Sequence, residues 1–201
     1  MAHMSATRPY HHGDLRSALL RSAERTLREK GAGALSLREL ARDIGVSHAA
    51  PGRHFKDKQA LLDALALDGY ERLNQALHTA AEHPGLTLEE RMTALARAYL
   101  GFAVGNPELL ELMFARKHHP DSSAQLASAV DHSLASFTGL ITDAQERGEI
   151  VPGDPERITM VAAASLHGLA ALIAGCALEA EEALAGLDAH VHLLLHGLRP
   201  R

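Results

Sequence analysis

The chain has 201 residues, of which 46% are hydrophobic and 22% charged. This is the composition of an ordinary soluble protein that is long enough to bury a core. The single cysteine, Cys176, excludes an internal disulfide framework and a zinc site built from cysteines, and it suits a reducing cytoplasm. No stretch holds the roughly 18 uninterrupted apolar residues of a membrane-spanning helix, so we expect a cytoplasmic protein. Residues 1–4, with their second methionine, resemble a cloning remnant and are left out of the fold prediction.

The net charge of −5 is unevenly distributed along the chain. Residues 1–60 carry eleven Lys or Arg against six Asp or Glu, whereas residues 61–201 carry nine against nineteen. This asymmetry indicates that the first 60 residues meet a polyanion, although uneven surface charge alone would produce the same pattern.

Three helices are predicted in the first quarter of the chain. Apolar side chains at three- and four-residue spacing define the first, and Ser36 with Glu39 has the spacing of a capping box at the start of the second. Gly45 ends the second helix, and Ser47 is expected to cap the third. Two short helices around a glycine-containing turn predict a helix-turn-helix. The predicted ranges are about 14–30, 36–44 and 48–55.

Six further helices are predicted after a domain boundary near 56/57, and no convincing strand is found. Thr87 and Glu90 form a second capping-box pattern, while Pro107 and Pro155 suit the first turn of a helix. The sequence therefore predicts an all-α protein of about nine helices. The later predicted ranges are about 57–83, 88–105, 107–117, 121–147, 155–176 and 181–198.

The last two predicted helices, 155–176 and 181–198, are the most apolar. Two adjacent helices of this kind usually pack in a four-helix arrangement with a symmetry-related copy. An ordinary core within one chain would give the same pattern.

Residues 12–65 resemble the TetR family of repressors. The resemblance rests on the order of a glycine-ended helix, a capped helix, a Gly-Val-Ser turn and a His-Phe-x-x-Lys-x-x-Leu segment. The chain also resembles a subgroup with the so-called WHG C-terminal domain. Leu166 stands where a tryptophan would precede His167 and Gly168. The segments that carry the resemblance are 10–15, 31–41, 45–51, 53–62 and 166–169.

The resemblance implies a homodimer that joins through its last two helices and binds a palindromic operator in double-stranded DNA. His48, Ala49 and Ala50 would face the major groove. Gly52 stands where most relatives have a phosphate-contacting tyrosine. Glycine there costs a short helix about 1 kcal/mol relative to alanine, so we expect DNA binding to be weakened but retained. Phosphates would be contacted by Ser36, Ser47, Arg53, His54 and Lys58, with Arg8 and Tyr10 reaching along the backbone or a minor groove.

The resemblance also implies that residues 57–201 bind a small-molecule effector that releases the repressor from DNA, with no cofactor. His167, a lone polar side chain among apolar neighbours, is the polar candidate for orienting that molecule. Each candidate could equally belong to the plain core. The candidates on apolar helix faces are Phe102, Leu109, Met113, Phe114, Phe137, Ile141 and His167.

Three other functions stay open at this point. His192 and His196, with Asp188 one turn earlier, have a spacing that suits a first-row metal, but such spacing is common on solvated helices. No nucleophile elbow, phosphate-binding loop or dinucleotide fingerprint is present, so we expect no enzyme. A hydrolase built from His118, His132 and His167, or a DNA-binding scaffold without a ligand, are the remaining alternatives.

Overall fold

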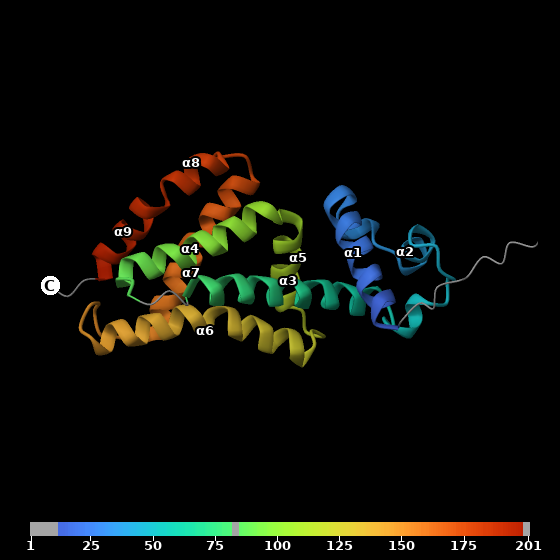
Figure 1. Ribbon diagram of the computed structural model, residues 1–201, viewed down its shortest axis with the longest axis horizontal. Helices are drawn as coiled ribbons and strands as arrows, with labels where there is room; N and C mark the ends of the chain where they lie inside the picture. Colours follow the sequence, from blue (N-terminus) through green and yellow to red (C-terminus); the bar gives the residue numbers. More distant parts are fainter. Residues whose placement is uncertain (1–11, 82–84, 199–201) are drawn as a thin grey trace, which may run out of the picture. The chain divides into compact units, whose positions relative to one another are not determined.

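The computed structural model describes residues 12–81 and 85–198, and all regular structure in these ranges is helical (Figure 1). The prediction of an all-α fold is therefore confirmed. The predictions for Arg8 and Tyr10 lie outside the described residues. The α-helices are α1 (His12–Lys30), α2 (Leu37–Asp43), α3 (Lys58–Ala81), α4 (Leu88–Gly105), α5 (Pro107–Lys117), α6 (Ala124–Glu146), α7 (Pro155–Ala174), α8 (Ala180–Ala185) and α9 (Leu187–Leu198), with 3₁₀ turns at Ala32–Ala34 and Pro51–Arg53.

The chain divides into two compact units between Leu65 and Ala66, inside α3. The predicted boundary at 56/57 falls just before this helix begins. One continuous helix therefore starts in the N-terminal unit and continues into the C-terminal unit.

The N-terminal unit is built on α1, whose apolar stripe is buried. Leu19, Ala23 and Leu27 are buried there, as are Leu40 of α2 and Phe55. Burial of these aliphatic and aromatic groups supplies the main stabilisation of such a small unit. The predicted ends of the first two helices agree with the structure to within two residues.

The turn after α2 follows the predicted pattern, but the capping box predicted at the start of α2 is absent. Gly45 has a φ of 72°, a left-handed conformation that glycine adopts without strain, and the Val46 N–H donates to the Ala41 carbonyl at 2.9 Å. Ser36 is the N-cap residue of α2, yet its side chain makes no capping hydrogen bond. The full capping box occurs instead at Thr87 and Glu90, before α4.

The third predicted helix, 48–55, is wrong: the structure has turns and one short 3₁₀ helix, Pro51–Arg53. The Ala50 N–H donates to Ser47, the Arg53 N–H to Ala50 and the His54 N–H to Pro51, each spanning three residues. Pro51 has no N–H to continue an α-helical ladder, and Gly52 has the poorest helix propensity after proline. Because two helix-disfavouring residues stand together, the segment closes as a tighter and shorter turn.

The C-terminal unit packs α4 against α7 and α9, and α6 against α7. Its buried side chains include Leu95, Leu100, Met113, Ile141 and Leu187. Gly69 of α3 lets α5 approach closely: a Cβ atom there would lie 2.6 Å from the Met113 sulfur. Helices α3 and α5 therefore meet at a point where only glycine fits the present packing.

The last predicted helix, 181–198, is also wrong, because the structure interrupts it at Gly186 and makes two helices, α8 and α9. Glycine weakens a helix interior. The interruption is stabilised because both pieces bury apolar side chains, Ala183 before it and Leu187 after it. Helix α7 is shorter than predicted and ends at Ala174.

Helix α7 ends in a motif that normally contains glycine. Cys176 follows the helix with a φ of 56°, the Cys176 N–H donates to Ile173 at 3.0 Å and the Ala177 N–H to Leu172 at 2.9 Å. This is the Schellman pattern of hydrogen bonds, with a cysteine at the left-handed position. A side chain at that conformation costs the folded state free energy that glycine would avoid.

Candidate functional site

A hollow on the surface of the N-terminal unit gathers two of the predicted DNA contacts. Ser36 and His48 line it, together with Arg38, Glu39 and Arg42. The two arginines are four residues apart on α2, so their side chains share one exposed face of that helix. The hollow therefore brings one candidate base-reading residue, one hydroxyl and two guanidinium groups together.

The remaining predicted DNA contacts are accessible. Ser47, His48, Ala49, Gly52 and Arg53 are exposed. The half-buried residues are Ser36, Ala50, His54 and Lys58. These placements are compatible with the predicted roles, which stay predictions.

Lys58 has a partner within its own unit. Its Nζ donates to the Gly33 carbonyl at 2.9 Å, which ties the start of α3 to the turn before α2. An ammonium group has three N–H donors, so two remain for a phosphate.

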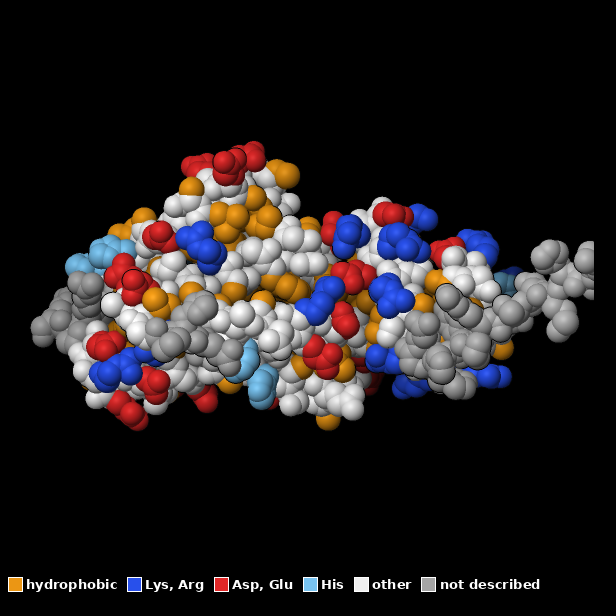
Figure 2. Space-filling model, in the orientation of Figure 1, with side chains coloured by type: hydrophobic (Ala, Val, Ile, Leu, Met, Phe, Trp, Pro, Cys, Tyr) orange, Lys and Arg blue, Asp and Glu red, His pale blue; other side chains and the backbone are white. Residues whose placement is uncertain are grey.

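The N-terminal unit displays basic side chains in addition to the predicted DNA contacts. Figure 2 shows Lys and Arg side chains gathered over this unit. Arg38 and Arg42 were missed because only positions matching the family pattern were carried over. Their i, i+4 spacing next to the N-cap Ser36 was the available signal. Arg42 also forms exposed ion pairs with Glu39 at 4.0 Å and Asp43 at 3.9 Å, which solvent weakens.

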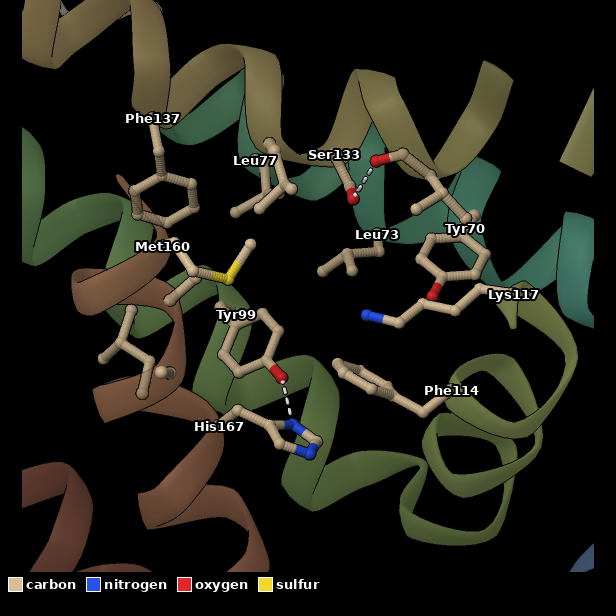
Figure 3. Close-up of a pocket in the computed structure, with 15 residues that line it drawn as sticks. Tyr70, Leu73, Leu77, Tyr99, Phe114, Lys117, Ser133, Phe137, Met160 and His167 are labelled. Carbon is tan, nitrogen blue, oxygen red and sulfur yellow. Dashed lines mark hydrogen bonds between the residues drawn. The ribbon is translucent and has the colours of Figure 1, made fainter. Parts of the chain in front are cut away.

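A cavity of about 240 Å³ lies inside the C-terminal unit, among α3, α4, α5, α6 and α7 (Figure 3). Most of its wall is aliphatic or aromatic, the usual character of a small-molecule site. Met160 and Ala164 of α7 belong to the wall and are exposed, so the cavity reaches the surface along α7. The lining residues are Tyr70, Leu73, Leu77, Tyr99, Phe114, Lys117, Val130, Ser133, Leu134, Phe137, Met160, Ala163, Ala164, Leu166 and His167.

His167 is held in place from two sides. Its Nδ1 lies 2.9 Å from the Tyr99 hydroxyl, and its ring stacks on Phe114 with centroids 4.0 Å apart and planes 17° apart. Burial, and secondarily the charge of Lys117, lowers the pKa of His167, which favours the neutral imidazole. With the imidazole neutral, we assign Nδ1 as the acceptor of the Tyr99 hydroxyl proton, which leaves an N–H at Nε2. Burial raises the pKa of Tyr99, so its hydroxyl keeps that proton.

Lys117 brings a cation into the same cavity. Its amine points into the space between Tyr70, Tyr99 and Phe114 (Figure 3), and it lies 4.0 Å from the centre of the Phe114 ring. Lys117 is half-buried, and this burial lowers the pKa of its amine. The aromatic face attracts the ammonium group but does not neutralise it.

Three of the seven predicted effector contacts line this cavity: Phe114, Phe137 and His167. The other four do not. Leu109, Met113 and Ile141 are buried in the core, where the first two pack beneath Gly69. Phe102 is half-buried on α4 and outside the cavity lining. Helical spacing identifies an apolar face, but it does not distinguish the part of that face that packs from the part that borders empty space.

The polar groups Tyr70, Tyr99 and Lys117 were missed by the sequence prediction. Tyr70 donates a long hydrogen bond of 3.5 Å to the Met113 carbonyl. A lysine as the last residue of a predicted helix is ordinarily a solvated C-terminal charge, so nothing in its sequence context indicated a cavity.

The histidines considered as an alternative metal position contact other groups. His192 Nδ1 lies 3.0 Å from a Glu89 carboxylate oxygen, and the rings of His192 and His196 are 6.5 Å apart. Asp188 pairs with Arg97 at 2.9 Å. The described side chains at this position thus link α9 to α4. His118 and His132, offered for a hydrolase with His167, do not line the cavity.

Comparison with known proteins bears on both units. A family model described as "Tetracyclin repressor-like, C-terminal domain" matches residues 92–198, more than half of the chain. A second model, "Bacterial regulatory proteins, tetR family", matches residues 19–65. The chain belongs to the TetR family. Members of this family are transcriptional regulators rather than enzymes; they bind DNA operators, dimerise and respond to small molecules.

Individual relatives agree with this TetR-family assignment. An HTH-type transcriptional repressor of Mycobacterium tuberculosis is 32% identical over 130 residues, 61% of this chain and 69% of the repressor. An HTH-type transcriptional regulator of the same organism is 30% identical over 122 residues, 58% of this chain and 52% of the regulator. The match thus spans about half the length of that relative.

A solved structure resembles this TetR-family chain over almost its whole length. A protein with unknown function from Rhodococcus sp. RHA1 is 45% identical, covers 96% of this chain and 100% of its own, and has a TM-score of 0.89. The TetR resemblance and the fold expected from it are confirmed. The subgroup with the WHG domain stays a prediction, although the C-terminal match includes its segment at 166–169.

Proposed function

We propose that the protein is a homodimeric repressor that binds a palindromic operator and leaves it when a small molecule occupies the cavity among α3–α7. The observation that carries the proposal is the basic N-terminal unit, in which Ser36, Arg38, Arg42 and His48, with Glu39, line one exposed hollow. Helix-turn-helix units use such a surface to bind phosphates on either side of a major groove while one segment contacts base edges.

The roles within this surface follow from side-chain chemistry. His48 offers a hydrogen bond to a base edge, and Ala49 and Ala50 offer apolar contact to thymine methyl groups. Arg42, Arg53 and Lys58 supply the charge that neutralises phosphates and releases counterions. The first group would determine sequence preference, while the second would strengthen binding to every DNA sequence.

Exposed apolar side chains support dimerisation through α7 and α9. Met160 and Val161 are 56% exposed, Leu172 is 49% and Leu193 is 72%. Helix α7 is long and apolar enough to pass for a membrane span by composition, yet only 22% of that window is buried in the single chain. Figure 2 shows hydrophobic side chains gathered at the surface near α8. A second copy covering it would remove this surface from water.

The dimer can be tested with one charge placed on this face. Val161→Glu and Leu172→Glu should each convert a dimer into a monomer in sedimentation equilibrium, because a buried unpaired carboxylate is costly. The matched control is Ala135→Glu, which adds the same group at an exposed position of α6 and should leave the dimer intact. A monomeric parent protein at micromolar concentration would contradict the proposal.

Helix α3 connects the cavity and the proposed DNA-binding unit through one continuous segment of chain. It begins in the N-terminal unit at Lys58 and carries the cavity residues Tyr70, Leu73 and Leu77. A ligand that prefers one placement of α3 shifts the population towards that placement, and DNA affinity falls if the placement suits the operator poorly.

The DNA arm of the proposal is tested by fluorescence anisotropy with the chain's own upstream DNA and a scrambled duplex, each at two salt concentrations. Selective, salt-dependent binding is expected. His48→Ala should relax discrimination at one or two base pairs, whereas Lys58→Ala should weaken both duplexes alike.

Lys56→Ala is the matched control, because Lys56 is exposed two residues away and outside the proposed contact set. Melting curves of Lys58→Ala separate a lost phosphate contact from the lost bond to Gly33. Equal losses on both duplexes for His48→Ala and Lys58→Ala would contradict the division of roles. Weak, equal binding by the parent protein that Gly52→Tyr fails to correct would contradict the DNA arm itself.

A further inference from the structure

Among the described residues, the cavity in the C-terminal unit is lined by a basic side chain and by no acidic one. Lys117 places an ammonium group inside it. No ion pair to Lys117 is found within residues 12–81 and 85–198; its contact is the Phe114 ring at 4.0 Å. A cation removed from water without a counter-charge is unfavourable unless a partner arrives. An anion in the cavity would supply that counter-charge.

The polar groups near this cation are donors. The Tyr70 hydroxyl makes only a 3.5 Å hydrogen bond, at the long limit of such bonds, so it can turn to a better acceptor. The Tyr99 hydroxyl is already engaged with His167 at 2.9 Å. The Lys117 ammonium and the Tyr70 hydroxyl therefore border the same cavity, a pair of donors that suits an oxyanion.

The rest of the cavity is apolar. Phe137, Leu77 and Met160 lie on one side of the space in Figure 3, and Lys117 and Tyr70 on the other. The cavity of about 240 Å³ is open at the surface beside Met160 and Ala164, so a ligand need not be fully enclosed.

We propose that the effector is a small amphipathic carboxylate, with its carboxylate bound by Lys117 and its apolar body against Phe137, Leu77 and Met160. This inference rests on the proposed effector function of the cavity and names the chemical class that would fill it. A single lysine matches a single negative charge. The apolar wall excludes a strongly hydrated ligand such as a free phosphate or a sugar acid.

The experiment compares three probes of equal chain length by isothermal titration calorimetry on the full chain: octanoate, octan-1-ol and octylammonium. Octanoate should bind about tenfold or more tightly than octan-1-ol, because a charge-assisted hydrogen bond to Lys117 is stronger than a neutral one. Octylammonium should not bind, since it brings a second cation beside Lys117.

Two lysine variants make the test specific. Lys117→Met keeps the length of the side chain and removes its charge, so octanoate affinity should fall to that of octan-1-ol while octan-1-ol binding persists. Persistent octan-1-ol binding shows that the cavity is still folded. Lys117→Arg should restore part of the preference for octanoate. Lys56→Met removes an exposed lysine of the other unit and should change nothing.

Equal affinity for octanoate and octan-1-ol would overturn the proposal, as would binding of octylammonium or an octanoate preference that survives Lys117→Met. Failure of octanoate to bind at millimolar concentration would also overturn it. No DNA is present in these titrations, so the outcome is separate from the DNA-binding test. A chain that binds octanoate but no operator would refute the repressor function and leave the ligand class standing.

Discussion

Two glycines in the N-terminal unit should respond to alanine in opposite directions. At Gly52 the φ angle lies outside the left-handed region, and an added Cβ would meet nothing within 4 Å. At Gly45 there is equal space, but φ is +72°, which side chains with a Cβ adopt only at a cost. A Cβ atom would therefore have room at both positions, and the two sites differ only in backbone conformation.

The expected magnitudes follow from this difference. Gly52→Ala reduces the freedom of the unfolded chain at no steric cost, so it should raise the free energy of unfolding by about 0.4–1 kcal/mol. Gly45→Ala has the same unfolded-state effect but incurs about 1–2 kcal/mol in the left-handed conformation, so it should lower the free energy of unfolding. About 1.5 kcal/mol should separate the two variants, or about 3–6 °C in melting temperature for a chain of this size.

The assay is urea denaturation followed by circular dichroism, with anisotropy on the proposed operator as a second readout. Gly52→Ala should also strengthen DNA binding by up to about fivefold, because the 51–53 segment would be ordered before it meets DNA. Shifts of the same sign in both variants would refute the reasoning. A destabilising Gly52→Ala would show that the 3₁₀ turn needs its glycine.

Three further predictions concern helix ends and the cavity. Cys176→Gly should raise the free energy of unfolding by up to about 1 kcal/mol, because glycine adopts the left-handed position without strain; an unchanged urea midpoint would contradict this. Thr87→Ala should lower it by about 1 kcal/mol, because the hydroxyl that accepts the Glu90 N–H at 3.3 Å is lost, and Thr87→Ser, which keeps a hydroxyl, should restore most of it. The pKa of His167 is lowered in the folded chain, so the unfolded chain takes up the proton first and stability should decline as pH falls below about 6.5. That decline, measured by urea denaturation between about pH 7.5 and about pH 5.5, should be smaller in His167→Gln, and identical slopes would count against it.

Periodicity and cap chemistry were sufficient to predict most of the helices. The spacing of Leu19, Ala23 and Leu27 predicts the buried stripe of α1, because a helix repeats every 3.6 residues whatever it packs against. The capping box at Thr87 and Glu90 was found for a similar reason, since both partners lie within four residues of each other. The family motifs are equally local, and the two family models confirm them.

The predictions that depended on competing local preferences were less successful. Ser36 and Glu39 have the same spacing as Thr87 and Glu90, yet only the second pair forms a box. The segment at Pro51 and Gly52 was predicted as a helix from the Ser47 cap and the spacing of a helix-turn-helix, whereas its own residues favour a tighter turn. In both cases the residue spacing suits the predicted element, but the hydrogen bonds that these residues form are different.

What the sequence alone determined was the all-α class, the order of the helices, the basic character of the first 60 residues and the resemblance to TetR regulators, because each depends on residues close together in the chain. The cavity was decided by tertiary structure. Lys117, Tyr99 and His167 lie on three helices, and only the packing of α4, α5 and α7 brings an ammonium, with no ion-pair partner in the described part of the chain, into an apolar space beside an imidazole. Leu109 and Met113 look equivalent to Phe114 in the sequence, but in the structure they pack against Gly69 in the core. Whether an apolar residue packs or borders a void depends on the volume of its distant neighbours, which local spacing does not encode.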